Sequence, residues 1–148
     1  MGSIEVPNSG AVYVDTVAII YALEEFKDYK PILEPFWEAS ESGRLTLITS
    51  ELTLMEVLVG PLKSGRRDLQ KTYEKALLTS SITLVPISQV ILREAARLRA
   101  LMPRLRTPDA IHAATALCHD CALFLTNDHG LRETPGLAVA VLDDALAS

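Results

Sequence analysis

The sequence predicts an α/β protein in which a mostly parallel, five-stranded sheet is flanked by helices. Five short apolar runs, rich in β-branched residues, alternate with longer segments of helical periodicity. The runs lack alternation of polar and apolar residues, which is typical of strands buried on both faces of a parallel sheet. No internal repeat or linker divides the 148 residues. We therefore expect a single domain over residues 1–148, with residues 1–10 as a loosely ordered lead.

Each element has its own local signal. The predicted strands are Ala11–Val14, Leu45–Thr49, Ile82–Pro86, Ala122–Thr126 and Ala138–Leu142. The predicted helices are Val17–Glu24, Tyr29–Glu41, Glu51–Val59, Arg66–Leu78, Val90–Leu101 and a last one from Thr107 to about His119. Residues suited to capping helix N-termini are Thr16, Ser50, Ser88 and Thr107, the last followed by Pro108 at the first helical position. Gly60-Pro61 and Met102-Pro103 predict breaks between helices, and residues 128–136 predict the longest loop.

Composition limits the class of protein. The formal net charge of −5 argues against a protein that coats nucleic acid without specificity. A hydrophobic fraction of 49% indicates a compact chain. No apolar run approaches the roughly 20 residues that a membrane helix needs, and the first residues lack the pattern of a signal peptide. The sequence thus predicts a cytoplasmic protein without a membrane segment.

The two cysteines, Cys118 and Cys121, have the spacing of a metal or redox pair. A structural zinc site needs four ligands, and the chain has no second pair of cysteines. A redox pair would open a helix, whereas this pair follows one and enters a strand. We expect two buried, reduced thiols.

Four acidic residues, Asp15, Glu56, Asp109 and Asp128, carry most of the functional information. Each ends an apolar run or lies in the first turns of a predicted helix. Such positions converge in the crevice at the carboxyl ends of parallel strands. Two ionised carboxylates about 4 Å apart repel each other by roughly 4 kcal/mol at an effective dielectric constant near 20. A cluster of four therefore predicts a site for a hard dication, Mg²⁺ or Mn²⁺.

Each acid also has a purely structural interpretation. Asp15 can cap the following helix, Asp109 can compensate a helix dipole, and Asp128 can belong to a turn. Glu56 can be an exposed helix residue, although Leu52, Met55 and Val59 around it predict a mostly buried face. His112, one turn after Asp109, is expected to support the site by hydrogen bonding and not to bind metal.

Basic residues gather in two stretches, one containing Arg97, Arg104 and Arg106 and the other containing Lys63 and Arg66. Each stretch taken alone is typical of a solvated helix face. Beside a phosphate-cutting site, the same residues predict a track for RNA phosphates.

Four sequence blocks, in this order and spacing, resemble a known family. They are VYVDTVAIIYAL, SELTLMEVLVGPLKSG, TPDAIHAATAL and LFLTNDHGLRETPGLAVAVLD, each with one of the four acids. Together they resemble the PIN-domain ribonucleases, specifically VapC-like toxins of type II toxin–antitoxin pairs, from Val12 to Asp143. One departure is Val17, where the family commonly has a small polar residue or asparagine.

The resemblance implies a three-layer fold with strand order 3-2-1-4-5 and RNA cleavage by metal-activated water. The four acids would be catalytic and bind Mg²⁺ or Mn²⁺, with Thr16, Thr126 and His112 supporting them. The implied partners are an RNA substrate, a small antitoxin and a second copy in a homodimer. Candidate residues for the antitoxin surface are Tyr21, Phe26, Phe36 and Trp37, which core packing would explain equally well.

Three other functions fit parts of the pattern. A receiver-type phosphotransfer domain also clusters acids at strand ends, but it needs a late lysine, and none follows Lys75. A non-catalytic PIN-like scaffold that binds RNA or protein would be expected to lack one or more acids, and all four are present. A housekeeping RNA-processing nuclease keeps the chemistry without the toxin role, and the sequence alone does not separate these two.

Overall fold

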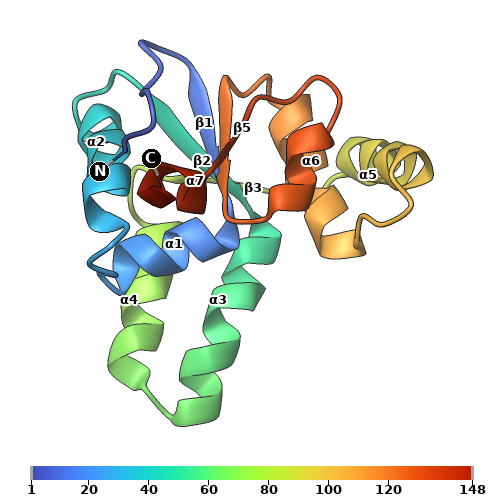
Figure 1. Ribbon diagram of the computed structural model, residues 1–148. Helices are drawn as coiled ribbons and strands as arrows, with labels where there is room; N and C mark the ends of the chain where they lie inside the picture. Colours follow the sequence, from blue (N-terminus) through green and yellow to red (C-terminus); the bar gives the residue numbers. More distant parts are fainter. Residues whose placement is uncertain (1, 148) are drawn as a thin grey trace.

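The computed structural model describes residues 2–147 as a five-stranded parallel sheet flanked by helices (Figure 1). Its strand order is β3-β2-β1-β4-β5, and all four strand pairs are parallel. The strands are β1 (Ala11–Val14), β2 (Thr46–Ser50), β3 (Thr83–Val85), β4 (Leu123–Thr126) and β5 (Val139–Val141). The predicted fold class and strand order are confirmed.

The helices form the outer two of three layers. They are α1 (Thr16–Leu23), α2 (Lys30–Glu41), α3 (Glu51–Ser64), α4 (Arg67–Leu78), α5 (Gln89–Leu101), α6 (Thr107–Cys118), the 3₁₀ helix η1 (His129–Glu133) and α7 (Leu142–Ala147). Buried residues of α1, α2, α4 and α7 form one core against one face of the sheet. Those of α5 and α6 form a second core on the other face. Among residues 2–147, no helix is both long and apolar enough to cross a bilayer.

The central strand β1 shows why the apolar runs lack alternation. Val12 and Val14 pack into the first core, whereas Tyr13 between them packs into the second. All three are fully buried, because helices cover both faces of the sheet. β1 lies between β2 and β4, so the strand order reverses between β1 and β4. The carboxyl ends of these two strands therefore open onto the crevice where ligands bind in such sheets.

The predicted helix break at Gly60-Pro61 is wrong. The helix α3 continues to Ser64 and ends at Gly65, whose φ of 70° is left-handed. Pro61 removes one backbone hydrogen bond, but it is buried on the same stripe as Thr53 and Val57. Packing against α4 in the hairpin therefore overrides the local breaking signal. Figure 1 shows this α3–α4 hairpin extending away from the sheet.

Smaller differences occur at element ends. The N-cap of α1 is Asp15 and that of α6 is Arg106, each one residue before the predicted cap, Thr16 and Thr107 respectively. Part of the loop predicted at residues 128–136 forms η1. The helix α7 was not predicted, because its first residue was assigned to the preceding strand.

Candidate active site

The four predicted acids line one open pocket of about 700 Å³ at the carboxyl edge of the sheet, which we call the acid pocket. Asp15 follows β1, Glu56 lies in the second turn of α3, Asp109 in the first turn of α6, and Asp128 just after β4. The lining also includes Thr16, Arg106, His112, Thr126, Asn127 and His129. Residues more than 110 positions apart in the chain thus share one site, as the sequence predicted.

Asp15 is held through both of its carboxylate oxygens. Oδ1 accepts a hydrogen bond from the backbone N–H of Thr16 at 2.8 Å. Oδ2 accepts one from the hydroxyl of Thr126 at 2.6 Å, and this hydroxyl also accepts from the N–H of Asp128 at 3.0 Å. A carboxylate offers about four lone-pair sites, so each oxygen keeps capacity for another partner.

Glu56 is anchored through one oxygen. Its Oε1 lies 2.8 Å from the donating hydroxyl of Thr16 and 2.7 Å from Nε2 of His112. Burial raises the pKa of Glu56, but the hydrogen bonds from His112 and Thr16 together outweigh burial and hold the pKa below its ordinary value. Glu56 is thus anionic at neutral pH, and both of these hydrogen bonds end on Oε1, which leaves Oε2 available.

His112 connects this acid to the interior of the protein. The ring is 2% exposed, and its Nδ1 lies 2.6 Å from the hydroxyl of Tyr13. The Tyr13 hydroxyl accepts from the N–H of Ser50 at 3.1 Å, so its own proton points to Nδ1. In its neutral form the ring therefore carries its proton on Nε2 and donates it to Glu56. Burial lowers the pKa of His112, but Glu56 and Asp15 raise it by a larger amount.

Hydrogen bonds thus link Tyr13 through His112 to Glu56, a chain that we call the relay. Tyr13 was not among the predicted site residues. The usable signal was a tyrosine in an otherwise aliphatic strand, two residues before Asp15, together with a histidine in an alanine-rich buried helix. Buried polar groups need hydrogen-bond partners, and each of these two is the partner of the other.

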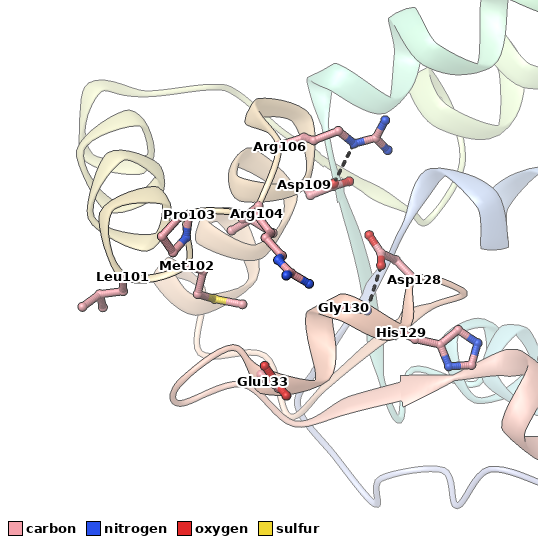
Figure 2. Close-up of a pocket in the computed structure, with 11 residues that line it drawn as sticks. Leu101, Met102, Pro103, Arg104, Arg106, Asp109, Asp128, His129, Gly130 and Glu133 are labelled. Atoms are coloured by element: carbon pink, nitrogen blue, oxygen red, sulfur yellow. Dashed lines mark hydrogen bonds and ion pairs between the residues drawn. The ribbon is translucent and has the colours of Figure 1, made fainter.

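Asp109 and Asp128 also line this pocket. Figure 2 shows each beside its partner, Arg106 for Asp109 and Gly130 for Asp128. Oδ2 of Asp109 lies 3.4 Å from Nε of Arg106, whose side chain is 81% exposed. Burial and the nearby charge of Asp128 raise the pKa of Asp109 above its ordinary value, despite Arg106. Oδ1 of Asp128 accepts from the N–H of Gly130 at 2.9 Å, so Asp128 also caps η1. The charge of Asp128 therefore acts on Asp109 within the same pocket.

The family model for the PIN domain matches residues 12–137, a span that contains all four acids. The chain belongs to the PIN-domain family. The family resemblance predicted from the sequence is therefore confirmed. A sequence comparison with curated proteins gives no match.

Solved structures with this PIN fold include components of toxin–antitoxin complexes. VapBC2 from Rickettsia felis bound to a promoter DNA fragment has a TM-score of 0.71 and 18% identity, covering 88% of this chain and 98% of that chain. DNA-bound VapBC from Salmonella typhimurium has a TM-score of 0.70 and 18% identity, with 89% and 98% covered. A toxin–antitoxin complex from Klebsiella pneumoniae has a TM-score of 0.64 and 26% identity, with 88% and 97% covered.

The donor set of this PIN domain suits a hydrated Mg²⁺ or Mn²⁺. Oxygen ligands are those that hard dications prefer, and Mg²⁺ commonly binds through one or two carboxylates while keeping several waters. Within residues 2–147, no three carboxylate, imidazole or thiol groups are arranged to hold an ion together. The open pocket and the free lone pairs on Asp15 and Glu56 leave room for an ion that keeps several of its waters.

The surroundings of Glu56 differ from the prediction. Met55 and Val59 are 57% and 43% exposed, so the face of α3 beside Glu56 is not mostly buried. The buried stripe of α3 runs instead through Thr53, Val57 and Pro61, one position away around the helix. Helical spacing of apolar residues was misleading here because α3 projects from the body of the PIN domain and exposes several of them.

The predicted RNA-binding residues separate into two groups. Arg104 and Arg106 lie at a pocket beside the acids. Arg97 is ion-paired with Glu94 on α5 and lines none of the pockets around the acids. Lys63 and Arg66 lie at the tip of the α3–α4 hairpin, away from the strand ends (Figure 1). The structure therefore brings two of the five to the site.

Two further predictions concern residues outside the acid pocket. The cysteines are reduced, but Cys118 is exposed and only Cys121 is partly buried. Of the aromatic residues on the early helices, Phe36 is fully buried in the core. Tyr21 and Trp37 instead line a small pocket of about 180 Å³ between α1 and α2.

Proposed function

We propose that the protein is a Mg²⁺- or Mn²⁺-dependent endoribonuclease and the toxin of a toxin–antitoxin pair. The observation that carries the proposal is the convergence of Asp15, Glu56, Asp109 and Asp128 in one pocket at the point where the strand order reverses. Membership of the PIN-domain family and the likeness to toxin–antitoxin structures support it.

The proposed chemistry divides roles among the residues of the pocket. A bound dication supplies acidity to a water molecule and stabilises charge on the leaving oxygen. Asp15 and Glu56 are already oriented by Thr16, Thr126 and His112, so they present fixed oxygens to the ion. Asp109 would bind the ion directly from the opposite side of the pocket, and Asp128 would bind it directly or through water. The expected products carry a 5′-phosphate and a 3′-hydroxyl.

The toxin role requires a partner that closes the acid pocket. We propose a small antitoxin that presents a basic residue to the carboxylates and apolar residues to the early helices. Phe26, which is 42% exposed, and the small pocket lined by Tyr21 and Trp37 are the features of α1 and α2 that such a segment can contact. A small gene beside this one, encoding a protein that copurifies with this chain and blocks RNA cleavage, would separate a toxin from a housekeeping nuclease. A homodimer remains part of the proposal.

Replacing Asp15 with asparagine tests the enzymatic proposal. Asparagine keeps the N-cap and the overall shape but removes the charge, so RNA cleavage in Mn²⁺ is expected to fall by at least 100-fold. The matched control is Asp28→Asn, an exposed acid in the α1–α2 connection that is absent from the acid pocket. Undiminished cleavage by Asp15→Asn would contradict the proposed role, as would an equal loss in the control.

A further inference from the structure

A second pocket of about 720 Å³ adjoins the acid pocket. The last residue of α5 and the α5–α6 connection, residues 101–106, form one wall, and η1 forms the other (Figure 2). Four residues line both pockets: Arg106, Asp109, Asp128 and His129. The two spaces are therefore continuous, and anything bound in the second pocket lies next to the proposed site of cleavage.

Arg104 is the main polar feature of this second pocket. Its side chain is exposed, and among residues 2–147 it has no hydrogen bond or ion pair. Figure 2 shows it pointing into the space between the 101–106 connection and η1. Arg106, by contrast, is paired with Asp109 at the boundary between the two pockets. An unpaired guanidinium in a concave site retains all of its donors for a ligand.

The other side chains that line the second pocket differ in charge and polarity from one end of the pocket to the other. Met102, partly buried against the core of α5 and α6, offers a polarisable apolar surface next to Arg104. Glu133 lies on the η1 side and also has no ion-pair or hydrogen-bond partner within residues 2–147. Its carboxylate repels phosphate, so an anionic group is favoured near Arg104 and Arg106 and a neutral group farther in.

A nucleotide of single-stranded RNA has this distribution of charge. Its phosphate is an anion that guanidinium groups bind through paired hydrogen bonds. Its base is a neutral plane that stacks on arginine and packs against apolar side chains. An acidic peptide would meet the same three carboxylates, Asp109, Asp128 and Glu133, without a flat base to stack on Arg104 or pack against Met102. The lining therefore favours a nucleotide over a protein segment.

We propose that this second pocket seats a nucleotide adjacent to the scissile phosphate, with Arg104 binding its phosphate or base and Met102 contacting the base face. This inference rests on the proposed function, because it takes the acid pocket as the cleavage site. It assigns a specific role to Arg104, which belongs to a basic stretch that would otherwise be interpreted as a solvated surface.

Binding, measured apart from cleavage, tests this assignment. A fluorescently labelled five-nucleotide RNA with phosphorothioate linkages is titrated with protein in Ca²⁺, and anisotropy gives the affinity. Arg104→Ala is expected to weaken binding at least tenfold. The matched control is Arg44→Ala, an exposed arginine just before β2 at the opposite edge of the sheet, which is expected to bind as the wild type does.

A second pair of variants tests the base contact. Met102→Ala is expected to weaken binding several-fold, whereas Met102→Leu keeps most of the apolar volume and most of the affinity. Thermal melts show whether either variant has lost its fold. In addition, an RNA carrying 4-thiouridine is expected to cross-link on irradiation to residues 101–106 or 129–133.

The outcomes separate the two proposals. If wild-type protein cuts RNA while Arg104→Ala binds no more weakly than Arg44→Ala, the nucleotide pocket is wrong and the nuclease proposal stands. If Arg104→Ala binds at least tenfold more weakly but no divalent ion supports cleavage by the wild type, the nuclease proposal fails. Nucleotide binding in the second pocket then stands, but its place beside a scissile phosphate does not. If wild-type protein neither binds nor cuts RNA, both fail.

Discussion

At the residue scale, hydrogen bonds orient Asp15 and Glu56 while leaving lone pairs free on both carboxylates. The hydroxyl of Thr126 and the N–H of Thr16 hold Asp15, while Thr16 and His112 hold a single oxygen of Glu56. These partners orient the carboxylates without neutralising them. Hydrogen bonds that orient ligands in this way tune both the geometry and the affinity of metal sites.

The hydroxyl of Tyr13 is expected to matter because it closes the relay behind Glu56. Tyr13→Phe leaves the N–H of Ser50 without its acceptor and Nδ1 of His112 without its donor, which costs about 1–3 kcal/mol of unfolding free energy. It is also expected to weaken the stabilisation that Mn²⁺ gives. Chemical denaturation with and without Mn²⁺ measures both effects.

Tyr73→Phe is the matched control for the relay. Tyr73 is equally buried, and its hydroxyl donates to Glu24, outside the acid pocket. This variant is expected to lose stability while keeping the full response to Mn²⁺. The role of the relay would be refuted if both variants kept that full response.

The two thiols are expected to differ in reactivity. Burial, with a smaller contribution from Asp120, raises the pKa of Cys121 to about 12, so almost none of it is thiolate at neutral pH. Exposed Cys118 is expected to react with Ellman's reagent in the folded protein, and Cys121 only after unfolding. Rapid reaction of both thiols in the native state would contradict this assignment.

At the element scale, the α3–α4 hairpin shows where local signals fail. Gly60-Pro61 predicts a break, yet α3 continues through it because Pro61 is buried in the hairpin. The actual end of α3 is at Gly65, where the backbone is left-handed. Strand positions and caps such as Ser50 and Ser88 were predictable because their signals are local. Packing between helices overrides such signals and is not visible in a short window.

The two glycines of this hairpin are expected to respond in opposite directions to alanine. Gly60→Ala is expected to add about 0.5–1 kcal/mol to the unfolding free energy, because the position is helical and has space for a Cβ. Gly65→Ala is expected to remove roughly 1–2 kcal/mol, because its φ of 70° disfavours any Cβ. Urea denaturation of the two variants measures both values, and effects of the same sign would contradict the position of the helix end.

At the scale of the whole molecule, topology gathers acids that are distant in sequence. Placement at strand ends or in the first turns of the helices that follow made Asp15, Glu56, Asp109 and Asp128 predictable as one group. The Tyr13–His112 contact spans 99 positions, and no local pattern in the sequence reports such a pairing. The second pocket was equally hidden, since it exists only where the α5–α6 connection meets η1.

The four carboxylates that meet in the acid pocket are expected to destabilise the folded protein in the absence of metal. Burial and Asp128 raise the folded-state pKa of Asp109, so ionising this carboxyl disfavours the folded state as pH rises through that pKa. Asp109→Asn is therefore expected to melt at a higher temperature than wild type at neutral pH without metal. In acid, where the carboxyl is protonated in both the folded and the unfolded state, this gain in melting temperature should disappear.

In Mn²⁺ the wild type should gain more stability than Asp109→Asn does. A lower melting temperature for the metal-free variant at neutral pH would instead indicate a structural helix residue.

The most direct test of the shared metal pocket is an anomalous-scattering map from a crystal soaked in Mn²⁺. We predict a peak between Asp15 and Glu56 on one side and Asp109 and Asp128 on the other, with Arg106 displaced from Asp109. An empty pocket in which Arg106 still binds Asp109, at Mn²⁺ concentrations that saturate other sites, would contradict this prediction.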